Sequence, residues 1–240
     1  MTNDIKFTPY WWELAPPALL DPQAVDRDCD AVVIGGGYAG LSAALTLSRA
    51  GRSVQVFDAS EPGIGASTRN GGITSGNLRP NISKLIKTFG PQNATAMYAE
   101  SVAARQDLKS FIEEEKIDCQ FRLSGRFSGA CRPEHYDSLA RDAELLNKNF
   151  NIDASMVSKA DQHAEIGTDY YNGGMLRPDI GGLHPALFHR SMVERTLAAG
   201  AKIHSHTPIC GVRRDGSGHE IVTNKGAVST QDVIVCTNGY

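Results

Sequence analysis

Residues 30–58 read DAVVIGGGYAGLSAALTLSRAGRSVQVFD, and this stretch decides the fold. The short apolar run 31–34 predicts a β-strand, which ends in a turn with glycines at positions 35, 36, 37 and 40. The next apolar residues recur at helical spacing, and a second apolar run, 54–57, closes on Asp58. The order strand, glycine turn, helix, strand and carboxylate predicts a dinucleotide-binding βαβ unit.

Three glycines of the turn have separate predicted roles. Gly35 permits the tight turn out of the strand, and Gly37 lets a pyrophosphate approach the backbone because it has no Cβ. Gly40 allows the helix to pack close to the strand. The start of the helix, at Tyr38 and Ala39, offers free N–H groups and the positive end of the helix dipole to phosphates.

Asp58 ends the second predicted strand. A carboxylate there can accept hydrogen bonds from both hydroxyls of an adenosine ribose, and it disfavours the 2′-phosphate of NADP. The alternative interpretation is an ordinary β-turn-α unit of another α/β protein, which leaves Asp58 unexplained.

Composition limits the remaining possibilities. The chain has 240 residues, 41% of them hydrophobic and 21% charged, as in ordinary globular proteins. A net charge of −3 gives no electrostatic case for nucleic acid or an anionic membrane. The N-terminus lacks the basic start and apolar core of a signal peptide, and no apolar run approaches the roughly 18 residues of a membrane span. The five scattered cysteines indicate reduced thiols in a cytoplasmic protein and no zinc site.

The remaining sequence alternates between helical and extended patterns. We expect an irregular proline-rich leader over 1–29, held to the body by Trp11 and Trp12, and a long functional loop over 59–80. The helices are expected at 91–116, 133–150 and 185–199. Extended segments are expected at 121–131, 170–176, 202–205, 209–213, 220–223, 227–229 and 233–236.

This order predicts an α/β fold in which a nucleotide-binding sheet is interrupted by an inserted α+β domain. The expected divisions are a leader (1–29), the first part of the nucleotide-binding domain (30–80), helices and a partial substrate domain (81–180), and a return segment (181–240).

Several motifs resemble the FAD-dependent D-amino-acid oxidase superfamily, and within it the gamma-glutamylputrescine oxidoreductases. The carriers of this resemblance are spread over almost the whole chain. They are the aromatic and proline leader (Tyr10, Trp11, Trp12 and 15–17), the unit 30–58, the segment GASTRNGG at 65–72, the segment GGML at 173–176, the segment GGLHP at 181–185, and VCTNGY at 235–240.

The resemblance implies a Rossmann-like FAD domain, FAD as cofactor, and oxidation of the C–N bond of an amine or amino acid by hydride transfer to flavin N5. The electron acceptor would be oxygen or another molecule, and no catalytic base is assigned. Arg69 would stabilise negative charge on reduced flavin, although spacing alone favours a surface charge. The implied cofactor-binding residues beyond the glycine turn and Asp58 are Ala66, Ser67, Arg69, Asn70, Gly71, Gly72, Cys210, Cys236 and Thr237.

Two departures from the superfamily stand out. Asp58 replaces the usual Glu, and the chain stops where family members continue, so we expect a truncated chain that binds FAD poorly. The alternative functions are a non-catalytic nucleotide-binding chain and an NAD-dependent oxidoreductase. His184 is expected to cap a helix. His204 and His206 are expected to face one side of a strand, without a third metal ligand.

Overall fold

The structure is a computed structural model, and it describes residues 5–239. The chain forms two compact units, of which unit 1 comprises 1–71 and 184–240 and unit 2 comprises 72–183. The sequence placed the boundaries at 80/81 and 180/181. Residues 72–80 belong to unit 2, where strand β3 (Ile73–Thr74) pairs with β7 (Gly181–Gly182).

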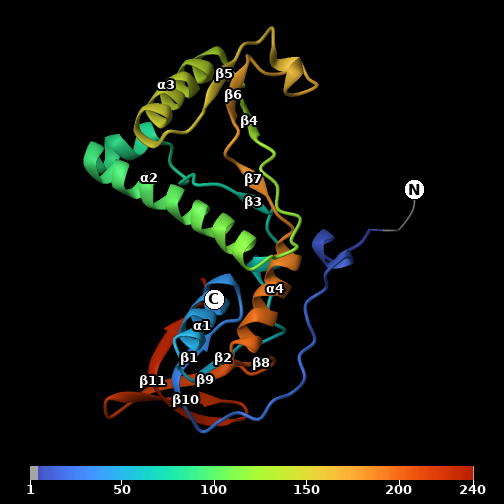
Figure 1. Ribbon diagram of the computed structural model, residues 1–240, viewed down its shortest axis with the longest axis vertical. Coiled ribbons are helices and arrows are strands. Elements are labelled where there is room, and N and C mark those ends of the chain that lie inside the picture. Colours follow the sequence, from blue (N-terminus) through green and yellow to red (C-terminus); the bar gives the residue numbers. More distant parts are fainter. Residues whose placement is uncertain (1–4, 240) are drawn as a thin grey trace. The chain divides into compact units, whose positions relative to one another are not determined.

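Unit 1 is built on a six-stranded sheet with the order β8-β2-β1-β11-β10-β9 (Figure 1). Four neighbouring strands run parallel, and the β9–β10–β11 part is antiparallel. The strands are β1 (Asp28–Ile34), β2 (Val54–Phe57), β8 (Lys202–His204), β9 (Ile209–Asp215), β10 (Gly218–Thr223) and β11 (Gly226–Val235). This is the sheet of a Rossmann-like domain, so the predicted fold class is confirmed for this unit.

Helices α1 (Tyr38–Arg49) and α4 (Pro185–Ala198) pack against each other in unit 1. Leu41, Ala44 and Leu45 form the buried stripe of α1, at the spacing that the sequence predicted. The side chain of Thr196 on α4 donates a hydrogen bond to the carbonyl of Leu41, at 3.4 Å. The two helices therefore pack side by side, and α1 also contacts β1 and β2 of the sheet.

Strand β11 differs from the prediction, which had two short strands over 227–229 and 233–236. The structure has one continuous strand, because β11 pairs with β10 at its start and with β1 along most of its length. The polar residues in the middle do not interrupt the strand. The Thr230 hydroxyl bonds to the carbonyl of Asp232, at 3.1 Å, and the Asp232 carboxylate pairs with Arg52, at 2.9 Å.

Unit 2 combines two helices with small sheets, in accordance with an inserted α+β domain. Helix α3 (Pro133–Phe150) matches its predicted range. The three-stranded sheet has the antiparallel order β4 (Arg126–Gly129), β6 (Gly174–Arg177) and β5 (Ser155–Val157). A buried apolar cluster joins α2, α3 and this sheet; its members include Leu85, Ala94, Tyr98, Leu146 and Met175.

Helix α2 (Ile82–Glu114) begins earlier than predicted. The prediction started at Pro91, but Asn81 caps an additional N-terminal segment by accepting a hydrogen bond from the Lys84 N–H, at 3.0 Å. Gly90 interrupts the helix with a φ of 78°. Pro91 therefore starts the second helical segment, where its fixed φ is suitable and its missing N–H costs nothing.

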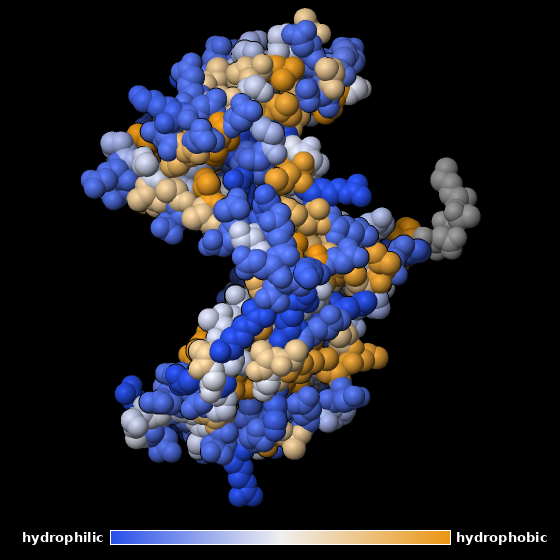
Figure 2. Space-filling view, viewed as in Figure 1, coloured by the Kyte–Doolittle hydropathy of each residue, from blue (hydrophilic) through white to orange (hydrophobic). Residues whose placement is uncertain are grey.

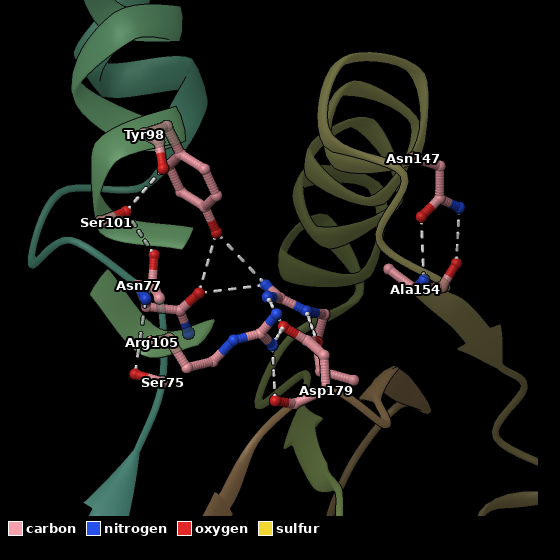
Figure 3. A network of polar contacts seen from close by, with 10 residues as sticks. Ser75, Asn77, Tyr98, Ser101, Arg105, Asn147, Ala154 and Asp179 are labelled. Carbon is pink, nitrogen blue, oxygen red and sulfur yellow. Dashed lines mark hydrogen bonds and ion pairs between the residues drawn. The ribbon is translucent and has the colours of Figure 1, made fainter. Parts of the chain in front are cut away.

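A buried polar network connects α2 with the segment after β6 (Figure 3). Arg177, 2% exposed, makes two hydrogen bonds to the Asp179 carboxylate, at 2.7 and 2.8 Å. Arg177 also donates to Asn77, at 3.0 Å, and Arg105 forms an ion pair with the same Asp179. Burial alone would raise the pKa of Asp179, but the hydrogen bonds and charge of Arg177 and the charge of Arg105 lower it.

The leader contains one short 3₁₀ helix, η1 (Tyr10–Glu13). Several of its apolar side chains are exposed, among them Phe7 and Leu19 at 95% and 86%. Blue hydrophilic residues predominate in Figure 2, and orange apolar residues form separate patches between them. Phe7 and Leu19 are the most exposed large apolar side chains among the described residues.

Candidate cofactor-binding site

A cavity of about 800 Å³ lies in unit 1 where β1, β2 and β11 end. Its position at the carboxyl ends of parallel strands is the usual place for a nucleotide in such a sheet. The lining residues come from the glycine turn, the end of β2, the loop 59–69 and the segments 208–209 and 236–238. All of these residues belong to unit 1.

The glycine turn has the geometry that its sequence predicted. Gly35 has a φ of 105°, and a Cβ on it would lie 2.7 Å from the carbonyl oxygen of Cys236. A Cβ on Gly40 would lie 1.9 Å from the carbonyl oxygen of Gly35. Since real Cβ atoms do not approach so closely, both positions require glycine. The predicted roles of Gly35 and Gly40 in the turn and in helix–strand packing are confirmed.

The N-terminus of α1 faces the same region. Gly37 occupies the N-cap position, where it supplies no side-chain oxygen to the helix. The Ser67 hydroxyl instead accepts a hydrogen bond from the Tyr38 N–H, at 3.0 Å. Gly37 and Ser67 both line the cavity. A helix start of this kind provides N–H groups and a positive dipole end for an anion such as a pyrophosphate.

Asp58 lines the cavity at the end of β2. One oxygen of its carboxylate accepts a hydrogen bond from the Gly36 N–H, at 2.8 Å, and the other accepts one from the Ser60 N–H, at 3.0 Å. These bonds fix the orientation of the carboxylate and attach it to the glycine turn. The oxygen bonded to the Ser60 N–H also accepts a hydrogen bond from the Ser60 hydroxyl, at 3.3 Å. The oxygen bonded to the Gly36 N–H accepts no other hydrogen bond from the described residues, so it retains capacity for a ribose hydroxyl.

The GASTRNGG segment (65–72) forms a compact turn around the 3₁₀ helix η2 (Ala66–Thr68). The Thr68 hydroxyl is buried and donates to the carbonyl of Gly63, at 2.6 Å. The Asn70 side chain donates to the carbonyls of Ala66 and Ser67, at 3.1 and 2.9 Å. Asn70 therefore organises this turn, and the segment is folded although the sequence suggested only a loop.

Two tryptophans attach the leader to the GASTRNGG segment. The sequence predicted that they attach the leader to the body of the protein, but not to which segment. The Trp11 indole N–H donates to the carbonyl of Asn70, at 2.8 Å, and the Trp12 indole N–H donates to the Thr68 hydroxyl, at 2.7 Å. The Arg69 guanidinium lies over the Trp12 ring, 4.9 Å from its centroid. Three consecutive residues of the segment thus contact the leader.

Two histidines of α4 lie behind this region. His184 caps α4 as predicted, because its Nδ1 accepts a hydrogen bond from the Leu187 N–H, at 3.2 Å. His189 is buried and its Nε2 donates to the carbonyl of Gly36, at 2.8 Å. Burial lowers the pKa of both imidazoles. The sequence analysis missed His189, since a single polar residue in a helical pattern carries no signal of its contact with a distant turn.

Most of the predicted cofactor-binding residues surround the cavity. The lining residues among them are Gly35, Gly37, Asp58, Ala66, Ser67, Arg69, Cys236 and Thr237. Tyr38, Ala39 and Gly40 form the start of α1. Asn70 and Gly71 are exposed and lie beside the lining residue Arg69. Gly72 belongs to unit 2.

Cys210 is exposed on β9, and its neighbours Pro208 and Ile209 line the cavity in its place. These two residues were not predictable as part of the site, because apolar side chains at the start of a strand have no distinctive spacing. Burial raises the pKa of the Cys236 thiol. Its ordinary value is already above neutrality, so this thiol stays protonated and uncharged at pH 7.

The expected placement of His204 and His206 on one side of a strand is wrong. Strand β8 ends at His204, which is buried, whereas His206 has a φ of 48° and is exposed. The left-handed residue reverses the direction of the chain, so the alternation of a strand no longer applies. Within residues 5–239, no group of three His, Cys, Asp or Glu side chains is arranged to hold a metal ion.

A comparison with protein families identifies the class of protein that this fold and cavity define. Residues 30–240 match the DAO family of FAD-dependent oxidoreductases. The chain therefore belongs to this family, whose cofactor is FAD. The described part of the chain contains no helix with the length and apolar character that crossing a membrane requires.

Two curated relatives are about 30% identical to this chain over the residues that align. A protein of Haemophilus influenzae named "Probable oxidoreductase OrdL" is 31% identical over 214 residues, which are 88% of this chain and 49% of that protein. The gamma-glutamylputrescine oxidoreductase of Escherichia coli is 28% identical over 212 residues, again 88% of this chain and 49% of that protein. The chain thus spans about half the length of these relatives.

Solved structures show the same fold. Glycine oxidase from Geobacillus kaustophilus superimposes with a TM-score of 0.72 at 20% identity, over 88% of this chain and 55% of that one. L-amino acid deaminase from Proteus vulgaris has a TM-score of 0.74 at 19% identity, over 91% of this chain and 50% of that one.

The residues of the cavity fit FAD. Glycines without Cβ, the start of α1 and an oriented carboxylate are the three groups that a dinucleotide requires. The cavity volume also falls in the range of about 300–1,000 Å³ that is typical of small-molecule sites.

Proposed function

We propose that this chain is the cofactor-binding part of an FAD-dependent oxidoreductase that oxidises the C–N bond of an amine or amino acid. The observation that carries the proposal is the single cavity on which the glycine turn, the start of α1 and Asp58 converge. FAD, when bound, would supply the hydride acceptor at flavin N5. The names of the relatives, among them an oxidoreductase of gamma-glutamylputrescine and a glycine oxidase, support this substrate class.

The residues around the cavity would each serve a different portion of FAD. Gly37 and the N–H group of Ala39 would receive the pyrophosphate, since the helix start attracts negative charge. The N–H group of Tyr38 would join them by exchanging the Ser67 hydroxyl for a phosphate oxygen. The Asp58 carboxylate would accept hydrogen bonds from the ribose. The backbone near Cys210 would contact the adenine. The remaining residues proposed to contact FAD are Ala66, Ser67, Arg69, Asn70, Gly71, Gly72, Cys236 and Thr237.

Arg69 is the cationic side chain among the described lining residues. A fixed guanidinium near the cofactor favours a state in which negative charge develops, without any reorganisation at that moment. We assign Arg69 this electrostatic role and assign no general base, because Asp58, Arg69 and Cys236 are the titratable side chains among the described lining residues. Proton transfer from substrate is therefore not attributed to any residue.

The proposed substrate is a gamma-glutamylputrescine-like amine, which would place the protein in putrescine catabolism. The support is the GASTRNGG segment and the relative from Escherichia coli. The proposed electron acceptor is oxygen or another small molecule. The proposed cytoplasmic location rests on the five cysteines, all of which are free thiols.

A second candidate function is binding of the nucleotide without turnover. The described lining residues favour it, because they serve a dinucleotide and include no group suited to activate an amine.

Flavin titration tests both candidates. The purified chain is titrated with FAD and with NAD, and the absorbance of the flavin bands and the quenching of flavin fluorescence are followed. We expect FAD to bind with one equivalent at saturation, whatever its affinity, and NAD not to bind. Asp58→Asn should weaken FAD binding, whereas Asp161→Asn, on an exposed turn of unit 2, should not. Absence of FAD binding would contradict the proposal.

Anaerobic reduction distinguishes turnover from binding alone. Addition of gamma-glutamylputrescine to the FAD-loaded chain should bleach the flavin bands if the chain oxidises amines. A chain that binds FAD but is not bleached by any of a panel of amines performs only the second candidate function.

A further inference from the structure

The contact between the leader and the GASTRNGG segment points to a role beyond attachment of the leader. Trp12 makes two contacts there at once: its N–H donates to Thr68, at 2.7 Å, and its ring lies under the Arg69 guanidinium, at 4.9 Å. Thr68 in turn donates to Gly63, at 2.6 Å. Gly63 and Arg69 both line the cavity. One side chain of the leader is thus connected to two points on the cavity wall.

Arg69 requires such a partner to be fixed. It is exposed, and no ion pair holds it within the described residues. A free arginine side chain loses considerable rotamer entropy when it is ordered, so its charge has no definite position without a contact. The face of an indole attracts a guanidinium and restricts it to one side.

We propose that Trp12 is a positioning residue for the cofactor: it orients Arg69 toward the cavity and, through Thr68, fixes the wall at Gly63. The inference rests on the proposed function, since it assumes that FAD occupies this cavity. Trp12 itself does not line the cavity, so its effect on FAD has to pass through Arg69 and Thr68. The leader then influences both the affinity of this site for FAD and the midpoint potential of the bound flavin.

Trp11 provides the matched control. It contacts the same segment, because its N–H donates to the carbonyl of Asn70, at 2.8 Å, and its ring packs against His184, 4.8 Å between centroids. No contact joins Trp11 to Arg69 among the described interactions. A substitution of Trp11 therefore disturbs the attachment of the leader without removing the aromatic face under the guanidinium.

The test measures FAD dissociation constants and the midpoint potential of bound flavin for Trp12→Leu, Trp12→Phe and Trp11→Phe. We expect Trp12→Leu to weaken FAD binding by about tenfold, the effect of losing a cation–π contact and a hydrogen bond together. Its midpoint potential should fall, because a displaced Arg69 stabilises the reduced flavin less. Trp12→Phe keeps an aromatic face, so its midpoint potential should lie close to that of the unaltered chain. Trp11→Phe should leave the midpoint potential unchanged.

A double-mutant cycle with Arg69→Met decides whether Trp12 acts through Arg69. If it does, Trp12→Leu has little further effect on the potential in the Arg69→Met background. Equal effects of Trp12→Leu in both backgrounds would overturn the inference, and so would an unchanged potential in Trp12→Leu.

The chain without cofactor supplies a readout that separates this inference from the proposed function. The Trp12 ring should shift the Arg69 side-chain proton resonances upfield, and the shift should disappear in Trp12→Leu but persist in Trp11→Phe. Failure of the unaltered chain to bind FAD would overturn the proposed function. Absence of the Arg69 shift would overturn the positioning role, whether or not FAD binds.

Discussion

Gly40 is the residue of the glycine turn with the least space around its Cα. A Cβ there would lie 1.9 Å from the carbonyl oxygen of Gly35, an atom of the backbone that cannot rotate away. We expect Gly40→Ala to lower the free energy of unfolding by about 3 kcal/mol, as overpacking does, and to abolish FAD binding. Urea denaturation measures the first effect and flavin titration the second.

Gly211 provides the control for Gly40. A Cβ on this strand residue would meet only Val222, at 3.9 Å, which is ordinary van der Waals contact. Gly211→Ala should leave both stability and FAD affinity within experimental error. Equal behaviour of the two variants would contradict the steric account of the turn.

His189 makes stability depend on pH. Burial lowers its pKa in the folded chain, so the folded state stays neutral where the unfolded imidazole, with a pKa near 6.5, takes up a proton. Its contribution is fully present above about pH 6.5 and is lost as the pH falls toward the lowered folded value. The urea midpoint of the unaltered chain should therefore decrease as the pH is lowered from 7.5 to 5.5.

His189→Gln tests this assignment. The Gln amide can still donate to the Gly36 carbonyl but does not titrate, so the variant should lose less stability between pH 7.5 and 5.5. Some dependence should remain, because burial also lowers the pKa of His184 and His204. An unchanged slope in His189→Gln would exclude His189 as a source.

Single residues were predictable where backbone geometry dictates them. Gly35, Gly40 and Asp58 follow from the spacing of a βαβ unit, because few other residues satisfy its sterics and hydrogen bonds. The hydrogen bond from Gly36 to Asp58 and the contact of His189 with Gly36 were not predictable. Both join residues far apart in sequence, and neither leaves a local pattern.

At the scale of elements, the polar network around Asp179 holds α2 to the segment after β6. Asp179→Asn removes the charge that compensates the buried Arg177. Because breaking a buried pair leaves an uncompensated charge, we expect a loss of about 3–5 kcal/mol in the free energy of unfolding. Thermal or urea denaturation of the purified variant checks this.

An exposed ion pair serves as the comparison. Arg213 and Glu220 lie 3.4 Å apart on neighbouring strands, with side chains that are 74% and 39% exposed. Glu220→Gln should change stability by no more than about 0.5 kcal/mol.

The lowered pKa of Asp179 also implies a contribution to stability that is present above about pH 4, the ordinary pKa of Asp, and is lost as the pH falls below it.

The elements that the sequence predicted best are those with complete local signals. Helix α3 begins at Pro133 and its apolar stripe continues to Phe150, so both ends were predictable. The first part of α2 was missed because Gly90 and Pro91 together resemble a helix start preceded by a loop. Strand β11 was divided in two because its polar centre is satisfied by Arg52, a partner from another part of the chain.

At the scale of the whole molecule, the cavity draws all of its lining residues from unit 1. FAD should therefore slow amide hydrogen exchange in residues 34–40, 57–69 and 234–238. Protection in α3 of unit 2 should not change. Exchange measured by mass spectrometry with and without FAD checks this. If FAD slowed exchange in α3 as much as in the cavity segments, the cofactor would couple the two units.

The interrupted architecture was predictable in outline because the sequence contains a βαβ unit near one end and a helix with strands near the other. The exact boundaries were not, because the pairing of β3 with β7 involves only two residues in each strand. So short a segment has no periodicity that a sequence pattern can detect.

The central position of β11 has a consequence for synthesis on the ribosome. The glycine turn is made first, but the carbonyl of Cys236 that closes against Gly35 is translated some 200 residues later. Until then β1 lacks its neighbour on one side, and the sheet has an open edge beside β1. Nascent chains should therefore be unable to take up flavin until β11 has emerged from the ribosome.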